Sequence, residues 1–384
     1  MKLIAKTLEG LEEVLAQEII DLGGENVEII RRAVIFNGNK VQLYKSNLWL
    51  RTCLKVLVFL KEIYIKNEND LYNEVKKIAW EDYFTADETF AIDSVVNSSI
   101  FRHSNFASLK AKDAIVDRFR EKYGYRPNVD TADPHIKINI HIREKTLTLS
   151  LDSSGNSLHL RGYRKAQVDA PLNEVLAAGL VYLSGWDKKS PLTDPMCGSG
   201  TILCEAARLA GQIPPQSLGR DFAFKKWKSF DADLYSDIIK EAESGINYGD
   251  IPSLNGFDMS PKAVKAAETN IECAGLQNYI QIEELDFFYQ DKAEGITLIF
   301  NPPYDGRLKE LDINNTYKQI GDKLKMNFEN CTAWILSGHL DAMKNVGLKP
   351  SARKKLLNGS IESIFCKYEM YKGSKKQKWA QKYG

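Results

Sequence analysis

The stretch Thr297-Leu298-Ile299-Phe300-Asn301-Pro302-Pro303-Tyr304 decides the fold expected for this chain of 384 residues. Its first four residues are apolar or β-branched, which is typical of a buried strand in a parallel sheet. The two prolines cannot donate to a β-ladder, so they end the strand. The amide of Asn301 and the ring of Tyr304 then lie at the carboxyl end of the strand, where open α/β sheets bind ligands. Such groups suit a flat heterocycle that carries an amino group.

A glycine loop lies about one hundred residues earlier and has the order strand, loop, helix. It reads Asp194-Pro195-Met196-Cys197-Gly198-Ser199-Gly200-Thr201 and precedes a helix expected at Ile202–Ala210. The glycines permit a tight turn and close approach of a ligand, although a purely structural turn is an equal alternative. The loop is neither a Walker loop nor G-x-G-x-x-G, because the lysine and the third glycine are missing. Asp194 favours a cationic ligand over a pyrophosphate.

Two further acidic residues follow predicted strands. Asp258 ends the strand expected at 254–258, and Asp286, followed by Phe287, comes after the strand expected at 280–282. An acid at such a strand end can accept hydrogen bonds from ribose hydroxyls. Each acid alone could be a cap or a surface residue, but three at successive strand ends indicate one site. The interval from Asp194 to Asp258 is longer than in dinucleotide-binding folds, so we expect residues 211–250 to form an insertion or extended crossover. Its cluster Phe222–Trp227 suits either core packing or contact with nucleic acid.

The front of the chain shows different patterns from the back. Residues 1–60 are typical of a small α+β unit, and residues 61–165 of a second unit. The second contains a helix expected at 105–123. One side of that helix is predicted to be apolar (Phe106, Leu109, Ala114, Ile115, Phe119) and the other basic (Lys110, Lys112, Arg118, Arg120, Lys122). The basic side could bind phosphates or simply face solvent. Residues 166–384 alternate strand and helix patterns, which predicts an α/β domain with a parallel sheet.

Composition excludes several classes of protein. The net charge is +1, so contact with nucleic acid must come from local basic patches. The six cysteines form no CxxC pair and do not cluster with the five histidines, which predicts free thiols in a reducing cytoplasm and no metal site. The N-terminus lacks the apolar region of a signal peptide, and no apolar run reaches the roughly 20 residues of a membrane span. We expect a cytoplasmic protein without a membrane partner, and a monomer rather than an oligomer, although the sequence leaves the oligomeric state open.

These motifs resemble one family. The loop Asp194–Thr201, followed by Glu205-Ala206-Ala207, resembles the S-adenosylmethionine loop of class I RNA methyltransferases, and Asn301–Tyr304 resembles the Asp/Asn/Ser-Pro-Pro-Tyr signature of enzymes that methylate base nitrogens. The whole chain is similar to THUMP-domain RNA guanine-N2 methyltransferases, and most to the N-terminal half of the bacterial bifunctional 23S rRNA enzymes. Further stretches that carry this resemblance are Asp152–Arg164, Ala170–Glu174, Gly347–Pro350 and Leu357–Glu362.

The resemblance implies a fold, a cofactor and a partner. It implies a C-terminal Rossmann-like class I methyltransferase sheet, preceded by ferredoxin-like and THUMP units of α+β class. It implies S-adenosyl-L-methionine as the methyl donor and RNA as the partner, with rRNA favoured over tRNA. The cofactor-binding residues that it implies are Asp194, Cys197, Gly198, Ser199, Gly200 and Thr201 for the methionine end, Asp258 and Met259 for the ribose, and Asp286 and Phe287 for adenine.

The implied catalytic residues are Asn301, Pro302, Pro303 and Tyr304. An exocyclic guanine amine is a poor nucleophile, so oxygen acceptors on its hydrogens would activate and orient it. We expect the Asn301 side-chain oxygen and the Pro302 carbonyl to accept these hydrogen bonds, and Tyr304 to stack on a base that has left its helix. The methylated amine is acidic and loses its proton afterwards, so no titrating base is needed.

Other functions remain open from the sequence. The tetrapeptide at 301–304 permits an adenine-N6 methyltransferase, although the THUMP-like front half disfavours DNA, and a tRNA guanine-N2 enzyme differs only in overall similarity. A nicotinamide-dependent oxidoreductase would want a third glycine and a shorter interval to the ribose acid. A non-catalytic RNA-binding module is the remaining alternative, and the intact acids and Asn301 argue against it.

Overall fold

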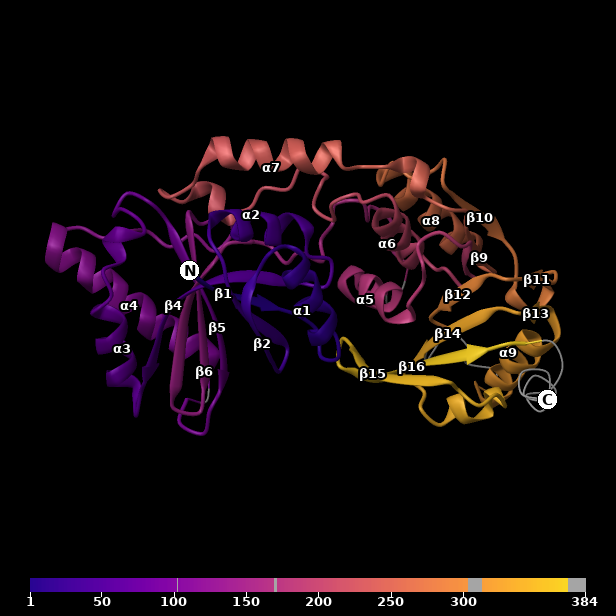
Figure 1. The fold of residues 1–384 in the computed structure, drawn as a ribbon. Helices are drawn as coiled ribbons and strands as arrows, with labels where there is room; N and C mark the ends of the chain where they lie inside the picture. The colour runs from indigo at the N-terminus through magenta and orange to yellow at the C-terminus, as the bar shows by residue number, and fades with distance from the viewer. Residues whose placement is uncertain (102, 169–170, 303–312, 372–384) are drawn as a thin grey trace. The chain divides into compact units, whose positions relative to one another are not determined.

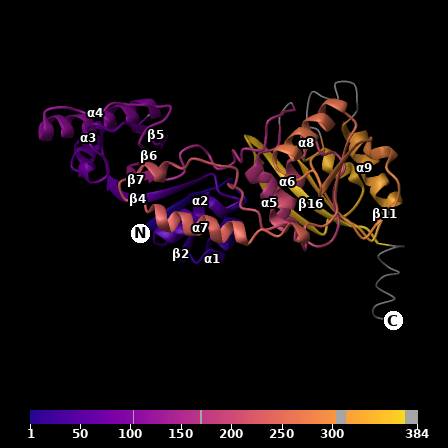
Figure 2. The same cartoon turned by 90° about the horizontal axis from the view of Figure 1, so that it is seen from above.

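The chain forms two compact units, each built on a seven-stranded sheet (Figures 1 and 2). A computed structural model describes all residues except 102, 169–170, 303–312 and 372–384. The N-terminal unit contains Met1–Thr7, Ala16–Leu158 and Gly219–Lys240. The C-terminal unit contains Leu8–Leu15, His159–Leu218 and Glu241–Gly384. The lysine-rich end of the sequence therefore lies outside the described residues.

The sheet of the N-terminal unit has the strand order β2-β3-β1-β4-β7-β6-β5 and is antiparallel except for the β5–β6 pair. Its long strand β4 pairs with β1 on one side and β7 on the other, so it joins two subsheets. The boundary expected at residue 60 falls inside β4. The strands are β1 (Lys2–Lys6), β2 (Glu25–Ile30), β3 (Ala33–Asn37), β4 (Lys55–Tyr64), β5 (Phe90–Asn97), β6 (Ile136–Arg143) and β7 (Thr146–Asp152).

Helices before β7 and short 3-10 turns belong wholly or partly to this unit. They are α1 (Glu12–Asp21), whose first residues belong to the C-terminal unit, α2 (Lys40–Trp49), α3 (Glu68–Lys76) and α4 (Ser104–Tyr123), with short 3-10 turns η1 (Trp80–Asp82) and η2 (Ala223–Lys226). The apolar side predicted for α4 is partly wrong, because Phe106 and Leu109 are 40% and 55% exposed. The buried stripe instead contains Ala107, Ala111 and Ala114 at spacings of three and four residues, and these small side chains let the helix approach its neighbours closely.

Part of the predicted insertion completes the N-terminal unit. The Phe224 ring stacks on Tyr44 with ring centroids 4.6 Å apart, and Phe230 and Tyr235 meet the same rings edge-on or tilted. The Tyr44 hydroxyl accepts a hydrogen bond from the Asp231 backbone at 3.0 Å. Core packing was therefore the correct interpretation of the aromatic cluster. Helix α7 (Ala232–Ser244) begins in this segment and η3 (Tyr248–Asp250) follows it.

The sheet of the C-terminal unit has the order β10-β9-β8-β12-β14-β16-β15, in which only β16 runs antiparallel to its neighbours. This arrangement confirms the predicted α/β class. The central strand β12 is almost fully buried at Leu298, Ile299 and Phe300. The strands are β8 (Leu192–Asp194), β9 (Leu254–Asp258), β10 (Ile280–Glu284), β12 (Thr297–Phe300), β14 (Thr332–Ser337), β15 (Ala352–Asn358) and β16 (Ile361–Glu369), with a separate small pair β11 (Ala293–Glu294) and β13 (Phe328–Glu329).

Helices cover this sheet, and their N-termini lie next to the carboxyl ends of the parallel strands. Figure 1 shows α5, α6 and α8 together, and α9 near β14 and β16. Helix α6 begins directly after the glycine loop, as predicted. The helices and 3-10 turns are α5 (Glu174–Ser184), α6 (Thr201–Ala210), α8 (Pro261–Cys273), α9 (Ile313–Asn327), η4 (Phe287–Tyr289) and η5 (Ala342–Val346). No helix in the described ranges is long and apolar enough to cross a membrane.

Candidate active site

The carboxyl ends of four parallel strands meet at one edge of the C-terminal sheet. Asp194 ends β8, Asp258 ends β9, Asp286 follows β10 and Asn301 follows β12. After β8 the chain continues to β9 on one side, whereas β12 lies on the other side of β8. This is a topological switch point, the place where open α/β sheets bind ligands. The sheet therefore brings the residues predicted for the donor and for catalysis to a single edge.

The glycine loop is held in place by backbone hydrogen bonds to β9. The Cys197 N–H donates to the Phe257 carbonyl at 2.8 Å, and the Gly198 N–H donates to the Asp258 carboxylate at 2.9 Å. Gly198 has φ of 56° and Gly200 has φ of 77°, values that other L-residues rarely adopt. A Cβ added at Gly198 would meet no described atom closer than the Val168 side chain, at 4.0 Å. The Gly198 backbone is therefore not crowded on its Cβ side, and α6 begins directly after the loop.

Asp194 is the buried acid of this site, with 1% of its surface exposed. One carboxylate oxygen accepts a hydrogen bond from the Met196 backbone at 3.2 Å. Burial raises the pKa of Asp194 well above its ordinary value, the Met196 hydrogen bond opposes this and the nearby charge of Asp258 adds to it. A cation bound beside the carboxylate would relieve that cost. This observation fits a donor that carries an ammonium and a sulfonium group.

Cys197 packs beneath the loop rather than acting as a nucleophile. Burial, together with the charges of Asp194 and Asp258, raises the pKa of its thiol well above the usual range. The thiol therefore stays protonated and unreactive at neutral pH. A Cβ added at Gly256 of β9 would lie 2.5 Å from the Ile282 side chain, 2.6 Å from the Leu203 side chain and 3.2 Å from the Cys197 sulfur, so the glycine makes room for all three.

The Asp258 carboxylate accepts two hydrogen bonds from the backbone of the chain. One of its oxygens accepts from the Gly198 N–H and the other from the Ser260 N–H, both at 2.9 Å. Each carboxylate oxygen has a second lone pair, so the group can still accept from a ribose. Met259, next in the chain, is 68% exposed and presents an apolar surface beside the acid.

The Asp286–Phe287 pair follows β10, with its carboxylate in a turn and its ring in the core. The Asp286 carboxylate caps η4 by accepting from the Phe288 N–H at 3.0 Å. The Phe287 ring is 2% exposed and stacks on Phe328 in the core, with centroids 5.9 Å apart. Its ring face is therefore not open to an adenine, and only its backbone and ring edge remain for contact. Tyr289, two residues on, is 80% exposed.

Strand β12 ends at Phe300, as predicted. β12 pairs in parallel with β8 and β14, and its last residue, Phe300, is fully buried. Asn301 is half-buried and Pro302 is buried at the strand end. Pro303 and Tyr304 lie outside the described residues, so stacking by Tyr304 stays a prediction.

Residues 161–168, which the sequence does not predict at the site, lie beside the glycine loop. The Asn270 side chain of α8 accepts from the Lys165 and Ala166 N–H groups, both at 2.9 Å, and donates to the carbonyls of Ala166 and Ser199 at 3.0 and 3.1 Å. The Arg164 guanidinium donates to Thr201 at 3.0 Å. Residues 161–168 are therefore fastened to the glycine loop, and their basic sequence was the only signal of this role.

Buried charges fix the same segment to α5 and α6. The Tyr163 hydroxyl donates to Glu205 at 2.9 Å, and the Arg161 guanidinium lies 3.6 Å from the same carboxylate, with both side chains fully buried. Arg164 pairs with Glu174 at 3.3 Å. Burial raises the pKa of Glu174 to about 7, although Arg164 opposes the shift. A network of this kind is costly to break, so it holds the segment in one position.

The geometry agrees with matches to known families. The methyltransferase domain described as RMKL-like matches residues 161–366, a THUMP domain matches 65–152, and the RlmL ferredoxin-like domain matches 2–57. The chain belongs to the RMKL-like methyltransferase family. Its C-terminal unit has the class I methyltransferase fold, and the predicted order of ferredoxin-like, THUMP and methyltransferase units is confirmed.

Relatives of this RMKL-like methyltransferase cover nearly all of its length. A protein of Synechocystis, provisionally named an RNA methyltransferase, is 39% identical over 96% of each chain. The ribosomal RNA large subunit methyltransferase K/L of Syntrophotalea carbinolica is 35% identical over 96% of this chain and 54% of its own, so the chain spans about half of such relatives. The structure of SMU.472, provisionally described as a methyltransferase and complexed with SAH, is 28% identical, with a TM-score of 0.86 over 97% of this chain and 99% of its own.

The basic helix face of the THUMP domain is largely paired with acids. Arg118 bonds to Glu81 through two nitrogens, at 2.8 and 2.7 Å, and Lys122 bonds to the same carboxylate. Arg120 pairs with Asp117 at 3.4 Å and Lys112 with Asp113 at 2.8 Å. The hydrogen bonds from Arg118 and Lys122 hold the pKa of Glu81 well below its usual range. Most cations on this face of α4 are therefore at least partly open to solvent and paired with acids of the same domain.

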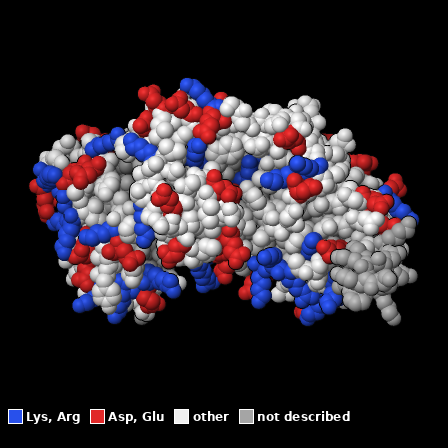
Figure 3. Space-filling view, in the orientation of Figure 1, with Lys and Arg blue, Asp and Glu red and all other residues white. Residues whose placement is uncertain are grey.

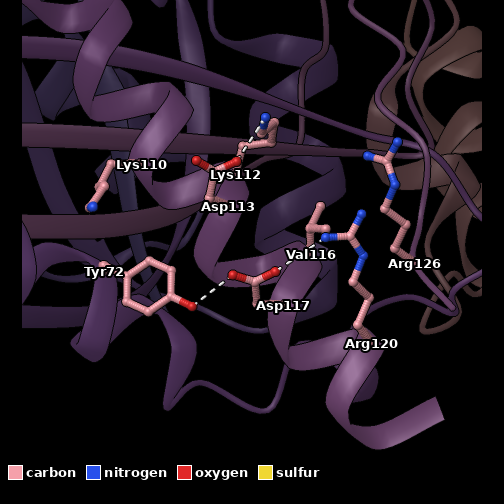
Figure 4. A pocket seen from close by; sticks show the side chains of 8 residues that line it. All are labelled: Tyr72, Lys110, Lys112, Asp113, Val116, Asp117, Arg120 and Arg126. Atoms are coloured by element: carbon pink, nitrogen blue, oxygen red, sulfur yellow. Dashed lines mark hydrogen bonds and ion pairs between the residues drawn. The ribbon is translucent and has the colours of Figure 1, made fainter. Parts of the chain in front are cut away.

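A hollow of about 500 Å³ lies on the same face, between α3 and α4 (Figure 4). The Tyr72 hydroxyl donates to Asp117 at 2.8 Å, and Lys110 lies over the Tyr72 ring. Its lining residues are Tyr72, Lys110, Lys112, Asp113, Val116, Asp117, Arg120 and Arg126. Because two acids sit among its four cations, the hollow is weakly positive. In the described part of the chain no cluster of metal-ligating side chains is present.

Proposed function

We propose that the chain transfers a methyl group from S-adenosylmethionine to the exocyclic N2 of a guanosine in large-subunit rRNA. The observation that carries the proposal is the gathering of Asp194, Asp258 and Asn301 around the switch point of the sheet. The names of the K/L relatives and the SAH bound to SMU.472 support the substrate and the donor. RNA-binding would come from the THUMP domain and from the methyltransferase unit together.

The donor supplies an electrophilic methyl group on a sulfonium, so the chain needs mainly to bind and orient. Asp194 and the backbone of the Cys197–Thr201 loop hold the methionine end, and Asp258 accepts from the ribose. Asn301 and the Pro302 carbonyl accept hydrogen bonds from the guanine amine and aim its nitrogen at the methyl carbon. As the N–C bond forms, the C–S bond breaks and its electrons stay on sulfur. The methylated amine then loses one proton to water.

The test uses the full chain, tritiated donor and unmodified transcripts of large-subunit rRNA and of tRNA. We expect label in the rRNA and N2-methylguanosine after digestion and mass spectrometry. N6-methyladenosine would overturn the base assignment, and label only in tRNA would overturn the substrate. Failure of the chain to bind S-adenosylmethionine by calorimetry would favour the non-catalytic RNA-binding module.

A further inference from the structure

A run of cations lies on the outer edge of the methyltransferase sheet, away from the residues already described. From Ala342 to Ile361 the sequence has five basic residues and no acidic one, although the whole chain has a net charge of only +1. We call Lys349, Arg353, Lys354 and Lys355 the β15 basic strip. All four are exposed. Figure 3 shows Lys and Arg gathered where Figure 1 draws β15 and β16.

The β15 basic strip differs from the basic face of α4 because its charges lack acidic partners. Among the described residues, no ion pair joins any of its four cations to an acid, and the cross-strand neighbours of Arg353, Lys354 and Lys355 are the uncharged Cys366, Phe365 and Ile364. Unpaired surface cations attract an anion more strongly than cations already neutralised by carboxylates.

Protection of the sheet edge does not account for these charges. Edge strands often carry a lysine that prevents pairing with another strand. This edge is already covered, because Gly10 packs against it so closely that an added Cβ would lie 2.5 Å from the Lys355 carbonyl. Three consecutive cations also point to both faces of the sheet, whereas one charge suffices for protection.

The strip is within reach of the proposed site. Strand β15 runs parallel to β12, and the order β12-β14-β16-β15 separates the two by three strand spacings. At about 4.8 Å for each spacing this is roughly 14 Å, a span that a few nucleotides bridge. Lys349 precedes the strand, and the strand register places Arg353 in the same cross-strand row as Phe300, the residue before Asn301.

We infer that the β15 basic strip binds the phosphate backbone of the substrate RNA beside the nucleotide to be methylated. The inference rests on the proposed function, because it assigns the strip to the same RNA. A row of exposed cations along one strand suits an extended polyanion better than a small anion. Its contribution is independent of base sequence, since contacts with phosphates position a nucleic acid and do not read it.

The test compares three full-length variants. The neutral variant combines Arg353→Gln, Lys354→Gln and Lys355→Gln. The control combines Lys325→Gln and Lys344→Gln, whose lysines lie on the same unit but are paired with Asp322 and Asp341. The charge-retaining variant combines Lys354→Arg and Lys355→Arg. Donor affinity by calorimetry shows that each variant is folded.

We expect the neutral variant to raise KM for unmodified rRNA about tenfold while kcat changes less than twofold. Its plot of log affinity against log salt, measured by fluorescence anisotropy, should lose about 0.7 to 0.9 in slope for each phosphate contact removed. The control and the charge-retaining variant should behave like the wild type. Equal KM and slope in the neutral variant and the control would overturn the inference, and self-association of the neutral variant with unchanged RNA affinity would assign the strip to edge protection.

The two proposals fail in different ways. Measurement of RNA binding by fluorescence anisotropy tests the role of the strip even if the wild type methylates no RNA. If the wild type transfers no methyl group but the neutral variant has a smaller salt slope for RNA binding, the proposed function is wrong and the RNA-binding role of the strip stands. Methyl transfer by the wild type with no effect of the neutral variant would overturn only the strip.

Discussion

Asp194 and Glu81 are both acids with little exposure, yet their surroundings move their pKa values in opposite directions. Burial without a cationic partner raises the pKa of Asp194, whereas Arg118 and Lys122 lower the pKa of Glu81. The first carboxylate lies at the edge where we propose that the donor binds, and it would gain from a bound cation. The second is already satisfied by its own domain. The comparison shows that pairing, rather than the number of charged residues, separates the site that awaits a ligand from a surface that is complete.

The largest effect is expected at Asn301. Asn301→Ala removes the side-chain acceptor of the guanine amine, and we expect kcat to fall about 10³-fold, as for loss of one oriented polar group in other active sites. Donor affinity should stay within twofold, because the residue does not hold the donor. Methyl transfer and calorimetry measure the two quantities. Asn278→Ala, an exposed asparagine of the same unit, is the control, and an Asn301→Ala enzyme with full activity would disprove the role.

The second prediction concerns Asp194, the acid whose pKa is raised by burial. Asp194→Asn should weaken donor binding by about 10- to 100-fold, since a hydrogen bond to a charged group contributes roughly 1.5–3 kcal/mol. In the wild type, donor affinity should fall as the pH drops through the raised pKa of Asp194, because the protonated acid no longer attracts a cation. Calorimetry between about pH 5 and pH 8 measures this profile. The Asn variant should give a flatter profile, and a steep profile in the variant would exclude Asp194 as its source.

The same shift affects stability with the opposite sign. The raised pKa means that the folded protein without donor holds the Asp194 proton to a higher pH than the unfolded chain. The stability present at low pH is therefore lost as the pH rises from the ordinary value toward the raised one. Saturating donor should reduce this loss in thermal melts, and a donor effect that is independent of pH would contradict the linkage.

The positions of the strand ends in the C-terminal sheet were predicted correctly from the sequence. The β8, β9 and β12 ends follow from apolar runs that stop at Asp194, Asp258 and Asn301, and the resemblance supplied the family. The sequence does not predict which way a side chain turns or which distant partner it meets. The inward ring of Phe287 follows from the η4 turn and from Phe328, forty-one residues on, and no local pattern shows this.

The same limit explains the errors in the other parts of the chain. The basic face of α4 could not be judged from sequence, because the main partner of Arg118 is Glu81, outside the helix. The alanines that line its buried stripe are less visible than Phe106 and Leu109, which are exposed. The position of residues 161–168 beside the glycine loop could not be predicted, because their anchor, Asn270, lies about one hundred residues away.

Asn270 provides the third test. Asn270→Ala leaves the Lys165 and Ala166 N–H groups and the Ser199 carbonyl without their partner, and we expect the C-terminal unit to lose about 2–3 kcal/mol of stability. Donor affinity should fall with it, since residues 161–168 hold the glycine loop. Asn270→Asp keeps the acceptor but turns an oxygen toward the Ala166 and Ser199 carbonyls, so it should not restore the lost stability. Hydrogen exchange at Thr201–Ala210 measures the loss, and unchanged exchange in the Ala variant would show that the segment is held by the buried charges alone.

The smallest effect is expected at Glu81, the acid that is paired with Arg118 and Lys122. Glu81→Gln removes the charge that Arg118 and Lys122 share, and we expect the N-terminal unit to lose about 1–2 kcal/mol at neutral pH. Because the pKa of Glu81 is lowered on folding, its contribution is present above the ordinary value of 4.5 and is lost as the pH falls below it. Thermal melts of the wild type and the variant should therefore converge in acid. RNA affinity should change little, since the carboxylate meets only cations of its own domain. A variant that binds RNA more tightly would show that Glu81 masks a binding face, and α4 would then join the β15 basic strip as an RNA contact.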